Sequence, residues 1–129
     1  MRYLTARDIL VIHARIIDAT SGSHGVRDIG LLQSIARKPQ TAFGGKELYR
    51  GAFTKAAVYF EAIAQHHVFV DGNKRTSVAV AARFLFLNGF TLTLTNEELV
   101  AQALHVVLHK PELKEIAAWL KAHSKKIRK

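Results

Sequence analysis

TSVAVAARFLFLNG, residues Thr76–Gly89, is apolar on nearly every side when it is wound into a helix. A helix that is hydrophobic all round belongs in the interior of a domain. Asn88-Gly89 marks its end, because glycine adopts the left-handed C-terminal cap at the least cost. The stretch therefore predicts an all-α protein, a compact single-domain helical bundle built around one central apolar helix.

Helical signals recur on the N-terminal side of this segment. Thr5 followed by Asp8 resembles a capping box, and apolar residues then repeat at helical spacing to about Ala19. Asp28 is a candidate N-cap for a second, shorter helix. A third apolar face runs along residues 53–64. These patterns predict three helices before the central one.

On the C-terminal side, Thr95 and Glu98 predict another capping box, and Pro111 is expected in the first turn of the last helix. The segment FTLTL, residues 90–94, alternates with period two and indicates a short strand, although a lone strand has little to pair with. Residues 38–51 are the least regular and are expected to hold a short β-hairpin or flap.

Length and composition limit the class of protein. The 129 residues, 49% of them hydrophobic, fit one domain over residues 1–129 that can bury about two-thirds of its unfolded surface. The chain has no cysteine, which excludes disulfides and Cys-based zinc sites. It begins without a recognisable signal peptide, and its apolar runs are broken too early for a membrane span. These features predict a cytoplasmic protein with no membrane partner.

The net charge of +9 is concentrated at the C-terminus. Five of the nine charges fall in the basic tail of residues 121–129: Lys121, Lys125, Lys126, Arg128 and Lys129. Such a tail is usually solvated and frayed. The remaining body is modestly basic, which weakly favours acidic or phosphorylated partners.

Directly before the central helix, HHVFVDGNKRT concentrates groups that suit phosphate chemistry. The first turn of a helix offers unpaired N–H groups and the positive end of the dipole, and Lys74 and Arg75 add two charges there. Gly72 lets a ligand approach the backbone closely. His67 can act as a base near neutral pH, and Asp71 is a hard oxygen ligand suited to Mg²⁺.

Each of these residues also has a plainer explanation. Asp71 can be only a helix cap, His66 can be a histidine favoured by the end of a helix dipole, and Phe69 can be an ordinary core residue. Lys74 and Arg75 can be surface charge. These explanations do not account for the presence of a base, a metal ligand and an anion site together in one short loop.

Two other motifs are rejected. A P-loop needs a glycine five residues before its Gly-Lys-Ser/Thr ending, and GNKRT does not fit that pattern. Zinc binding by His66, His67 and Asp71 is disfavoured, because neighbouring residues on a helix point about 100° apart. His105 and His109 have a suitable spacing but no third ligand near them in sequence.

HVFVDGNKR, residues 67–75, closely resembles the His-x-Phe-x-Asp-(Gly/Ala)-Asn-Lys-Arg motif of Fic/Doc proteins in their Doc (death-on-curing) form. RDIGLLQSIARKPQTAFGGKELY and TLTLTNEELV are also similar to Doc-type toxins, so the resemblance extends from about Arg27 to Ala122. It implies the Fic/Doc fold, a compact helical bundle. It also implies the toxin of a type II toxin–antitoxin pair.

The resemblance implies a role for each residue of the motif. His67 would take the proton from a target hydroxyl, Asp71 would hold Mg²⁺ on the phosphates of ATP, and Phe69 would be the buried anchor of the loop. The phosphates would be bound by four consecutive residues: Gly72, Asn73, Lys74 and Arg75. A flap that positions the protein target would fall on the irregular stretch: Phe43, Gly44, Gly45 and Lys46.

Lys74 bears on the reaction that the resemblance implies. Typical Fic adenylyltransferases have glycine there, which leaves an open anion nest for the α-phosphate. Lysine would fill or reshape that nest with a compact charge. The Doc branch, with this lysine, transfers the γ-phosphate to a threonine of elongation factor Tu and stops translation. Fic enzymes usually carry a second arginine where this chain has Val78, which also argues against AMP transfer.

The chain contains no Ser/Thr-x-x-x-Glu-(Gly/Asn) inhibitory segment. The resemblance therefore implies an antitoxin that inhibits in trans through a disordered C-terminal segment. Two alternatives stay open, a protein adenylyltransferase and a non-catalytic nucleic-acid-binding module. His67 and Asp71 argue against the second, because a nucleic-acid binder needs neither a base nor a metal ligand. Direct nucleic-acid binding is not expected.

Overall fold

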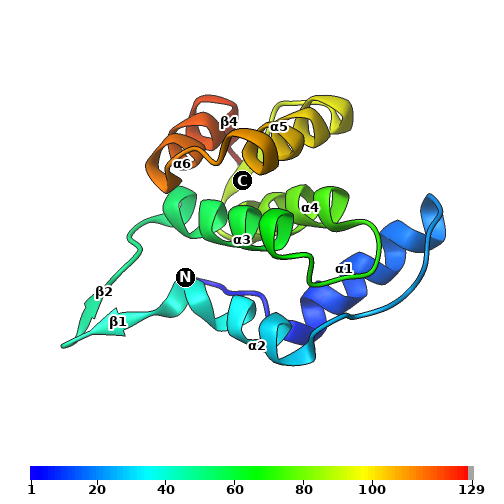
Figure 1. The fold of residues 1–129 in the computed structure, drawn as a ribbon. Coiled ribbons are helices and arrows are strands. Elements are labelled where there is room, and N and C mark those ends of the chain that lie inside the picture. Colours follow the sequence, from blue (N-terminus) through cyan, green and yellow to red (C-terminus); the bar gives the residue numbers. More distant parts are fainter. Residues whose placement is uncertain (128–129) are drawn as a thin grey trace.

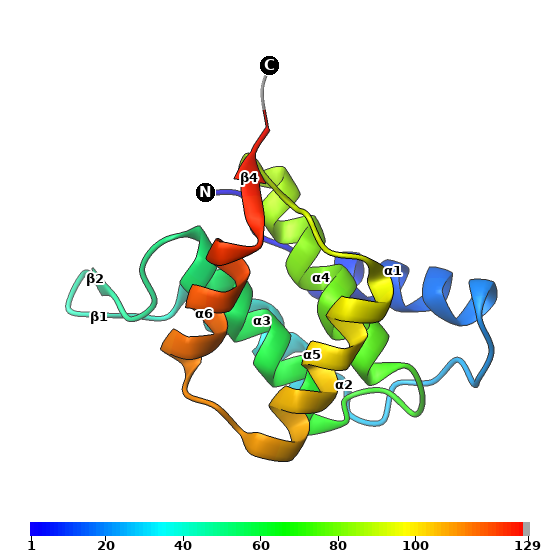
Figure 2. The same ribbon diagram turned by 90° about the horizontal axis from the view of Figure 1, so that it is seen from above.

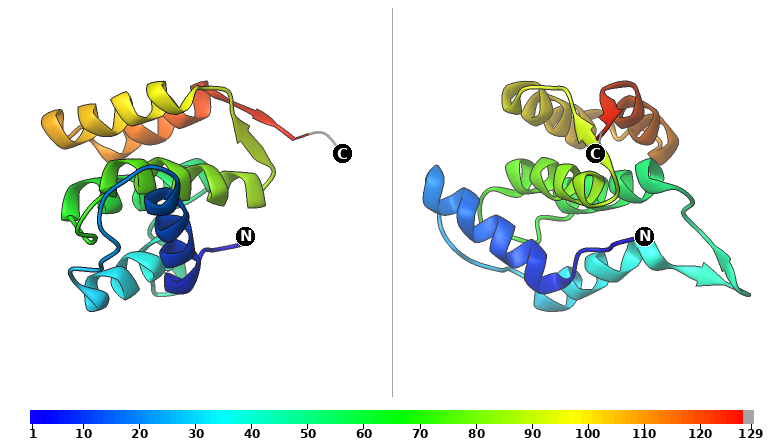
Figure 3. Two further views of the ribbon diagram at one scale, coloured as in Figure 1. Left: turned by 90° about the vertical axis from the view of Figure 1, so that its right-hand side faces the viewer. Right: turned by 180° about the vertical axis from the view of Figure 1, so that it is seen from behind.

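The computed structural model describes residues 1–127, in which the α-helices stack in three layers (Figures 1 and 3). Two helices form each layer. From one outer face through the middle to the other, they are α1 (Ala6–Ala19) with α2 (Ile29–Arg37), α3 (Ala52–His66) with α4 (Asn73–Leu87), and α5 (Asn96–His109) with α6 (Leu113–Ala122). The predicted all-helical bundle is confirmed.

The middle layer holds the core. α4 lies between α1 and α5, as its apolar sequence predicted, and packs along α3 (Figure 2). α3 is more enclosed still, since every residue from Lys55 to Phe60 is buried. α4 carries four exposed residues, Lys74 and Arg75 in its first turn and Arg83 and Phe86 further along. The centre of the fold is therefore a pair of antiparallel helices joined by the loop that contains the motif.

Most of the predicted helix ends are confirmed. The capping boxes of Thr5 with Asp8 and of Thr95 with Glu98 both form, and Asp28 caps α2 by accepting a hydrogen bond from the backbone of that helix. The position of Pro111 was predicted wrongly. α6 begins two residues later, because Lys110 turns the chain in a left-handed conformation and Glu112 is extended.

The segment after α4 is a strand, and it does have a partner. β3 (Phe90–Leu92) pairs antiparallel with β4 (Ser124–Lys126), with Thr91 opposite Lys125. The expectation of a frayed tail is therefore wrong for its first residues: Lys121 belongs to α6, and the next two lysines lie in β4. The strand pairs through its backbone, while its lysine side chains stay exposed, as is common on edge strands. The last two residues of the tail, 128 and 129, lie outside the described part.

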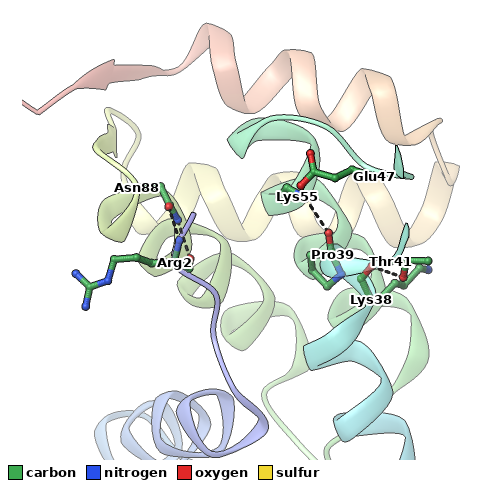
Figure 4. Close-up of polar contacts among 7 residues, drawn as sticks. All are labelled: Arg2, Lys38, Pro39, Thr41, Glu47, Lys55 and Asn88. Atoms are coloured by element: carbon green, nitrogen blue, oxygen red, sulfur yellow. Dashed lines mark hydrogen bonds and ion pairs between the residues drawn. The ribbon is translucent and has the colours of Figure 1, made fainter. Parts of the chain in front are cut away.

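The irregular segment contains the short hairpin that was expected. After the 3₁₀ turn Lys38–Gln40, β1 (Ala42–Phe43) pairs with β2 (Lys46–Glu47) around Gly44 and Gly45, whose φ angles are positive. Lys55 fastens this segment to α3. Its ammonium group, 1% exposed, donates to the Pro39 carbonyl and to a Glu47 carboxylate oxygen, each at 3.1 Å (Figure 4). A buried cation needs such partners.

The N-terminal segment is held against the end of α4. The side chain of Asn88 accepts from the Arg2 N–H at 2.8 Å and donates to the Arg2 carbonyl at 2.9 Å (Figure 4). Asn88 also donates to the Phe84 carbonyl at the end of the helix. One amide thus closes the helix and fixes the start of the chain.

Across residues 1–127, none of the helices has the length and apolar character that a membrane crossing requires.

Tyr59 provides a test of the core. Burial raises the pKa of its phenol to about 12, and its oxygen accepts from the Leu4 N–H at 3.1 Å. We expect Tyr59→Phe to lower the free energy of unfolding at neutral pH by about 1–2 kcal/mol, because the buried Leu4 N–H loses its partner. Because the pKa of Tyr59 is raised on folding, its contribution to the free energy of unfolding is complete below pH 10 and is lost as the pH rises from 10 to 12. The difference in free energy of unfolding between wild type and Tyr59→Phe should therefore shrink over that range. Urea unfolding from pH 7 to 11.5 measures both, and a difference that does not change with pH would contradict the assignment.

Candidate active site

The motif forms the connection between the two central helices. α3 ends at His66, and His67 follows in a left-handed conformation, with φ 48° and ψ 47°. Gly72 is also left-handed, with φ 77°, and immediately precedes α4. Two such residues reverse the chain within a short loop. The side chains of both histidines are exposed at this end of the middle layer.

Phe69 lies at the centre of the loop and is fully buried. The loop is closed on itself by Asn73, the first residue of α4. The Asn73 side-chain oxygen accepts from the Phe69 N–H at 3.0 Å, and its amide nitrogen donates to the Phe69 carbonyl at 2.9 Å. This arrangement differs from the role implied for Asn73. Its side chain is engaged within the loop, and its backbone N–H is one of those in the first turn of α4 that have no partner inside the helix.

This clamp predicts a stability effect. Asn73→Asp keeps the acceptor for the Phe69 N–H but places an oxygen against the Phe69 carbonyl. The lost bond and the repulsion cost about 1–3 kcal/mol, whereas a carboxylate at a helix N-terminus gains about 0.3–1 kcal/mol. We therefore expect a net loss of about 1–2 kcal/mol in urea unfolding. Asn96→Asp, at the exposed start of α5, is the matched control and should lose nothing.

Asp71 is not a helix cap, because Gly72 occupies that position and no side chain caps α4. One carboxylate oxygen, Oδ2, accepts from the Ser23 N–H at 2.8 Å. The other accepts no hydrogen bond from the described residues. No group of three metal-ligating side chains occurs within residues 1–127. An exposed carboxylate oxygen nevertheless fits Mg²⁺, which is commonly held by one or two carboxylates together with substrate phosphates.

The first turn of α4, which follows Asp71 closely in the chain, is a candidate anion site. Its first hydrogen bond runs from the Thr76 N–H to the Gly72 carbonyl at 2.9 Å. The N–H groups of the three preceding residues therefore have no partner inside the helix. Lys74 and Arg75 are exposed and form no salt bridge within the described residues. Two cations at the positive end of a helix dipole favour a bound anion such as phosphate.

The turn-rich segment of residues 20–28 braces the motif from outside. Val26 forms a β-bridge with Phe69, the Arg27 N–H donates to the Val68 carbonyl at 2.8 Å, and the Val70 N–H donates to the Gly25 carbonyl at 3.0 Å. The sequence predicted only the helices on either side of this segment, one ending near Ala19 and one starting near Asp28. The structure makes residues 20–28 the segment that lies directly beside the motif.

The hairpin assigned as a target-positioning flap is not at the site. Phe43, Gly44, Gly45 and Lys46 lie near the start of α3, whereas the motif follows its end (Figure 1). A helix of 15 residues separates the two by about 22 Å. The separation was not predicted from the sequence, because it depends on the length and direction of α3, which lies between the hairpin and the motif.

An apolar groove starts at the anion site. It has a volume of about 790 Å³ and lies between the C-terminal half of α1, one face of α4 and the start of α5. Arg75 lines it at the motif, and Val78 lines it one turn further along α4. Arg15 and Glu97 are the other charged residues of its wall. We call this the α1–α4–α5 groove.

His13 is the residue of the site that the sequence analysis missed. It is 3% exposed, and its ring stacks on Phe69 with the centroids 3.8 Å apart and the planes 6° from parallel. The signal was present in α1. Ile9 and Ile17, four residues to either side on the same helical face, are both buried, so a histidine between them must also point inward.

Comparisons with known proteins point to one family. The family model described as "Fic/DOC family" matches residues 3–85. The chain is 39% identical over 90 residues to a protein of Mycolicibacterium smegmatis named "Toxin Doc", a match that covers 70% of this chain and 67% of that protein. It is 32% identical over 89 residues to "Protein kinase doc" of Escherichia phage P1, covering 69% of this chain and 70% of that one.

Proposed function

The chain belongs to the Fic/DOC family, and on this basis we propose that it is the toxin of a toxin–antitoxin pair and acts as a protein kinase. The reaction is transfer of the γ-phosphate of ATP to a serine or threonine hydroxyl of a translation factor. The observation that carries the proposal is the braced loop between α3 and α4. It brings together an exposed histidine, an exposed carboxylate and a helix N-terminus that carries two exposed cations.

In this proposal His67 is the general base. It accepts the proton of the target hydroxyl while the hydroxyl oxygen bonds to the γ-phosphorus and the bond from that phosphorus to the β,γ-bridging oxygen breaks. ADP is the leaving group. The backbone N–H groups of the first turn of α4, with Lys74 and Arg75, bind the phosphates and neutralise their charge. Asp71 would hold Mg²⁺, which would supply further charge neutralisation at the phosphates.

Two side chains favour transfer of the γ-phosphate over transfer of AMP. Lys74 places a flexible ammonium group in the first turn of α4, where glycine would leave an open nest for an α-phosphate. Val78, 5% exposed, lines the apolar α1–α4–α5 groove. A second phosphate-binding arginine is therefore missing at that position. The relative from phage P1, which is named a protein kinase, supports the same choice.

The α1–α4–α5 groove is the site we propose for the antitoxin segment. Its volume of about 790 Å³ and its mostly apolar lining suit the apolar face of an amphipathic helix, and Arg75 of the first turn of α4 is part of its wall. Arg15 and Arg75 would pair with acidic residues of that segment, which agrees with the basic charge of the chain. An antitoxin bound there would obstruct the phosphates and thereby inhibit without any change in the fold.

We propose elongation factor Tu as the protein target, with residues 20–28 rather than the hairpin beside the bound hydroxyl. Such a target places the protein in the cytoplasm. The test is to incubate the purified factor with this protein, Mg²⁺ and ATP, and to measure the intact mass of the factor. We expect a gain of one phosphate and a matching loss of translation in a cell-free extract. The proposed target would be contradicted if the mass of the factor stayed unchanged while another protein of the extract gained phosphate.

A further inference from the structure

His13 touches the motif at two points from a different layer of the fold. Its ring stacks on Phe69, and its Nε2 lies 2.8 Å from the backbone oxygen of Asp71. A carbonyl only accepts, so Nε2 carries the proton and donates it. His13 thus contacts both the buried anchor of the loop and the residue next to the start of α4.

The hydrogen bond from His13 is made to the peptide group that leads into α4. The Asp71 carbonyl belongs to the peptide that joins Asp71 to Gly72. The orientation of this peptide sets the left-handed conformation of Gly72 and the direction in which α4 begins. α1 backs this peptide closely: a Cβ added at Gly72 would lie 3.1 Å from the end of the Ile17 side chain and 3.9 Å from the His13 ring.

Asp71 is therefore held from both sides. His13 fixes its carbonyl from α1, and Ser23 fixes its carboxylate from the segment of residues 20–28. A residue held at its main chain and its side chain has little freedom to turn its remaining carboxylate oxygen away from a metal. Positioning contacts of this kind commonly decide how well a metal ligand works.

We propose that His13 is a positioning residue, whose Nε2–H holds the Asp71 carbonyl and so aligns the metal-binding carboxylate with the anion site of α4. The inference rests on the function proposed above. Packing alone does not account for a histidine here. It shares the buried face of α1 with Ile9 and Ile17 and stacks on Phe69, and an apolar ring would fill that space without the cost of burying a polar group.

Two substitutions separate the hydrogen bond from the packing. His13→Phe keeps an aromatic ring against Phe69 and removes the donor. His13→Gln removes the ring but carries an amide nitrogen at about the distance of Nε2. A third variant, His13→Asn, has the same amide on a shorter side chain that does not reach the Asp71 carbonyl, so it controls for the polarity of glutamine and replaces the phenylalanine variant if that protein does not fold.

The first readout is steady-state phosphate transfer at varied Mg²⁺. We expect His13→Phe and His13→Asn to lose about 10- to 100-fold in kcat/KM, mostly through a weaker apparent affinity for Mg²⁺. His13→Gln should stay within about threefold of wild type, because it restores the donor. Equal losses in the glutamine and asparagine variants would overturn the proposal and leave His13 as a packing residue.

The second readout needs neither nucleotide nor activity. Hydrogen–deuterium exchange of the backbone amides of residues 68–76 should be faster in His13→Phe and His13→Asn than in wild type and His13→Gln, with the amides of α3 unchanged in all four proteins. Equal exchange in residues 68–76 across the four would overturn the proposal. If wild type transfers no phosphate at all, the proposed function fails, and the exchange measurement still decides the role of His13.

Discussion

Replacement of His67 by asparagine is expected to lower kcat for phosphate transfer by about 10²- to 10⁴-fold, the usual contribution of a general base. The imidazole is exposed and follows the last turn of α3, where it can meet a target hydroxyl without rearrangement of the core. Asparagine is preferred to alanine, because φ is 48° at this position and asparagine tolerates the left-handed conformation better. Its amide cannot accept a proton in the reaction.

The matched control for this variant is His66→Gln. His66 is the neighbouring exposed histidine and the last residue of α3. We expect it to keep wild-type kcat, and both variants to keep the circular dichroism spectrum and melting temperature of wild type. A His67→Asn protein that still transfers phosphate at the wild-type rate would show that the base lies elsewhere.

Phe69→Ala is expected to lower the free energy of unfolding by about 3–5 kcal/mol, a large part of the stability of a domain of this size. Phe69 is fully buried, its ring stacks on His13, and its backbone is bonded to Asn73 and bridged to Val26. Removal of the ring leaves a cavity where three segments meet. Backbone hydrogen bonds hold those segments in place, so they cannot approach one another to fill the cavity.

Phe43→Ala provides the comparison of the same chemical change at an exposed site. Phe43 is 69% exposed in the hairpin, so its truncation should change the stability by less than about 0.5 kcal/mol. Urea unfolding of wild type and both variants at one pH gives the two differences. A small loss for Phe69→Ala, close to that of Phe43→Ala, would mean that the loop is not anchored by this ring.

The helical part of the fold could be predicted from local sequence. Thr5 with Asp8 and Thr95 with Glu98 specify helix starts through contacts three residues apart, and the apolar run before Asn88 specifies a buried helix. Such signals lie within one turn and need no knowledge of the rest of the chain.

The errors concern contacts between distant segments. β4 was missed because its backbone pairs with β3 while Lys125 and Lys126 give it the composition of a solvated tail. The contacts of residues 20–28 with the motif were missed because this segment, rich in glycine and serine, has no hydrophobic periodicity from which a packing partner could be predicted. His13 was missed because it meets the motif only in three dimensions, although its helical face was readable.

For the candidate site, the motif predicted which loop holds the candidate residues but not the contacts that each of them makes. Spacing and residue type located the loop, the exposed carboxylate and the first turn of α4. They did not show that the Asn73 side chain is used to close the loop, which depends on the conformation of Phe69. They also did not show that Asp71 is held by both α1 and the segment of residues 20–28.

The most direct test of the proposed kinase activity uses ATP that is labelled on either the γ- or the α-phosphate and measures which label is transferred to protein. Purified protein would be incubated with Mg²⁺ and a translation extract, with the His67→Asn variant alongside. We expect label on a protein from γ-labelled ATP alone, and none with the variant. Label from α-labelled ATP alone would contradict the account and make the protein an adenylyltransferase. Transfer from neither, together with strongly salt-dependent binding of DNA, would contradict it in favour of a nucleic-acid-binding module.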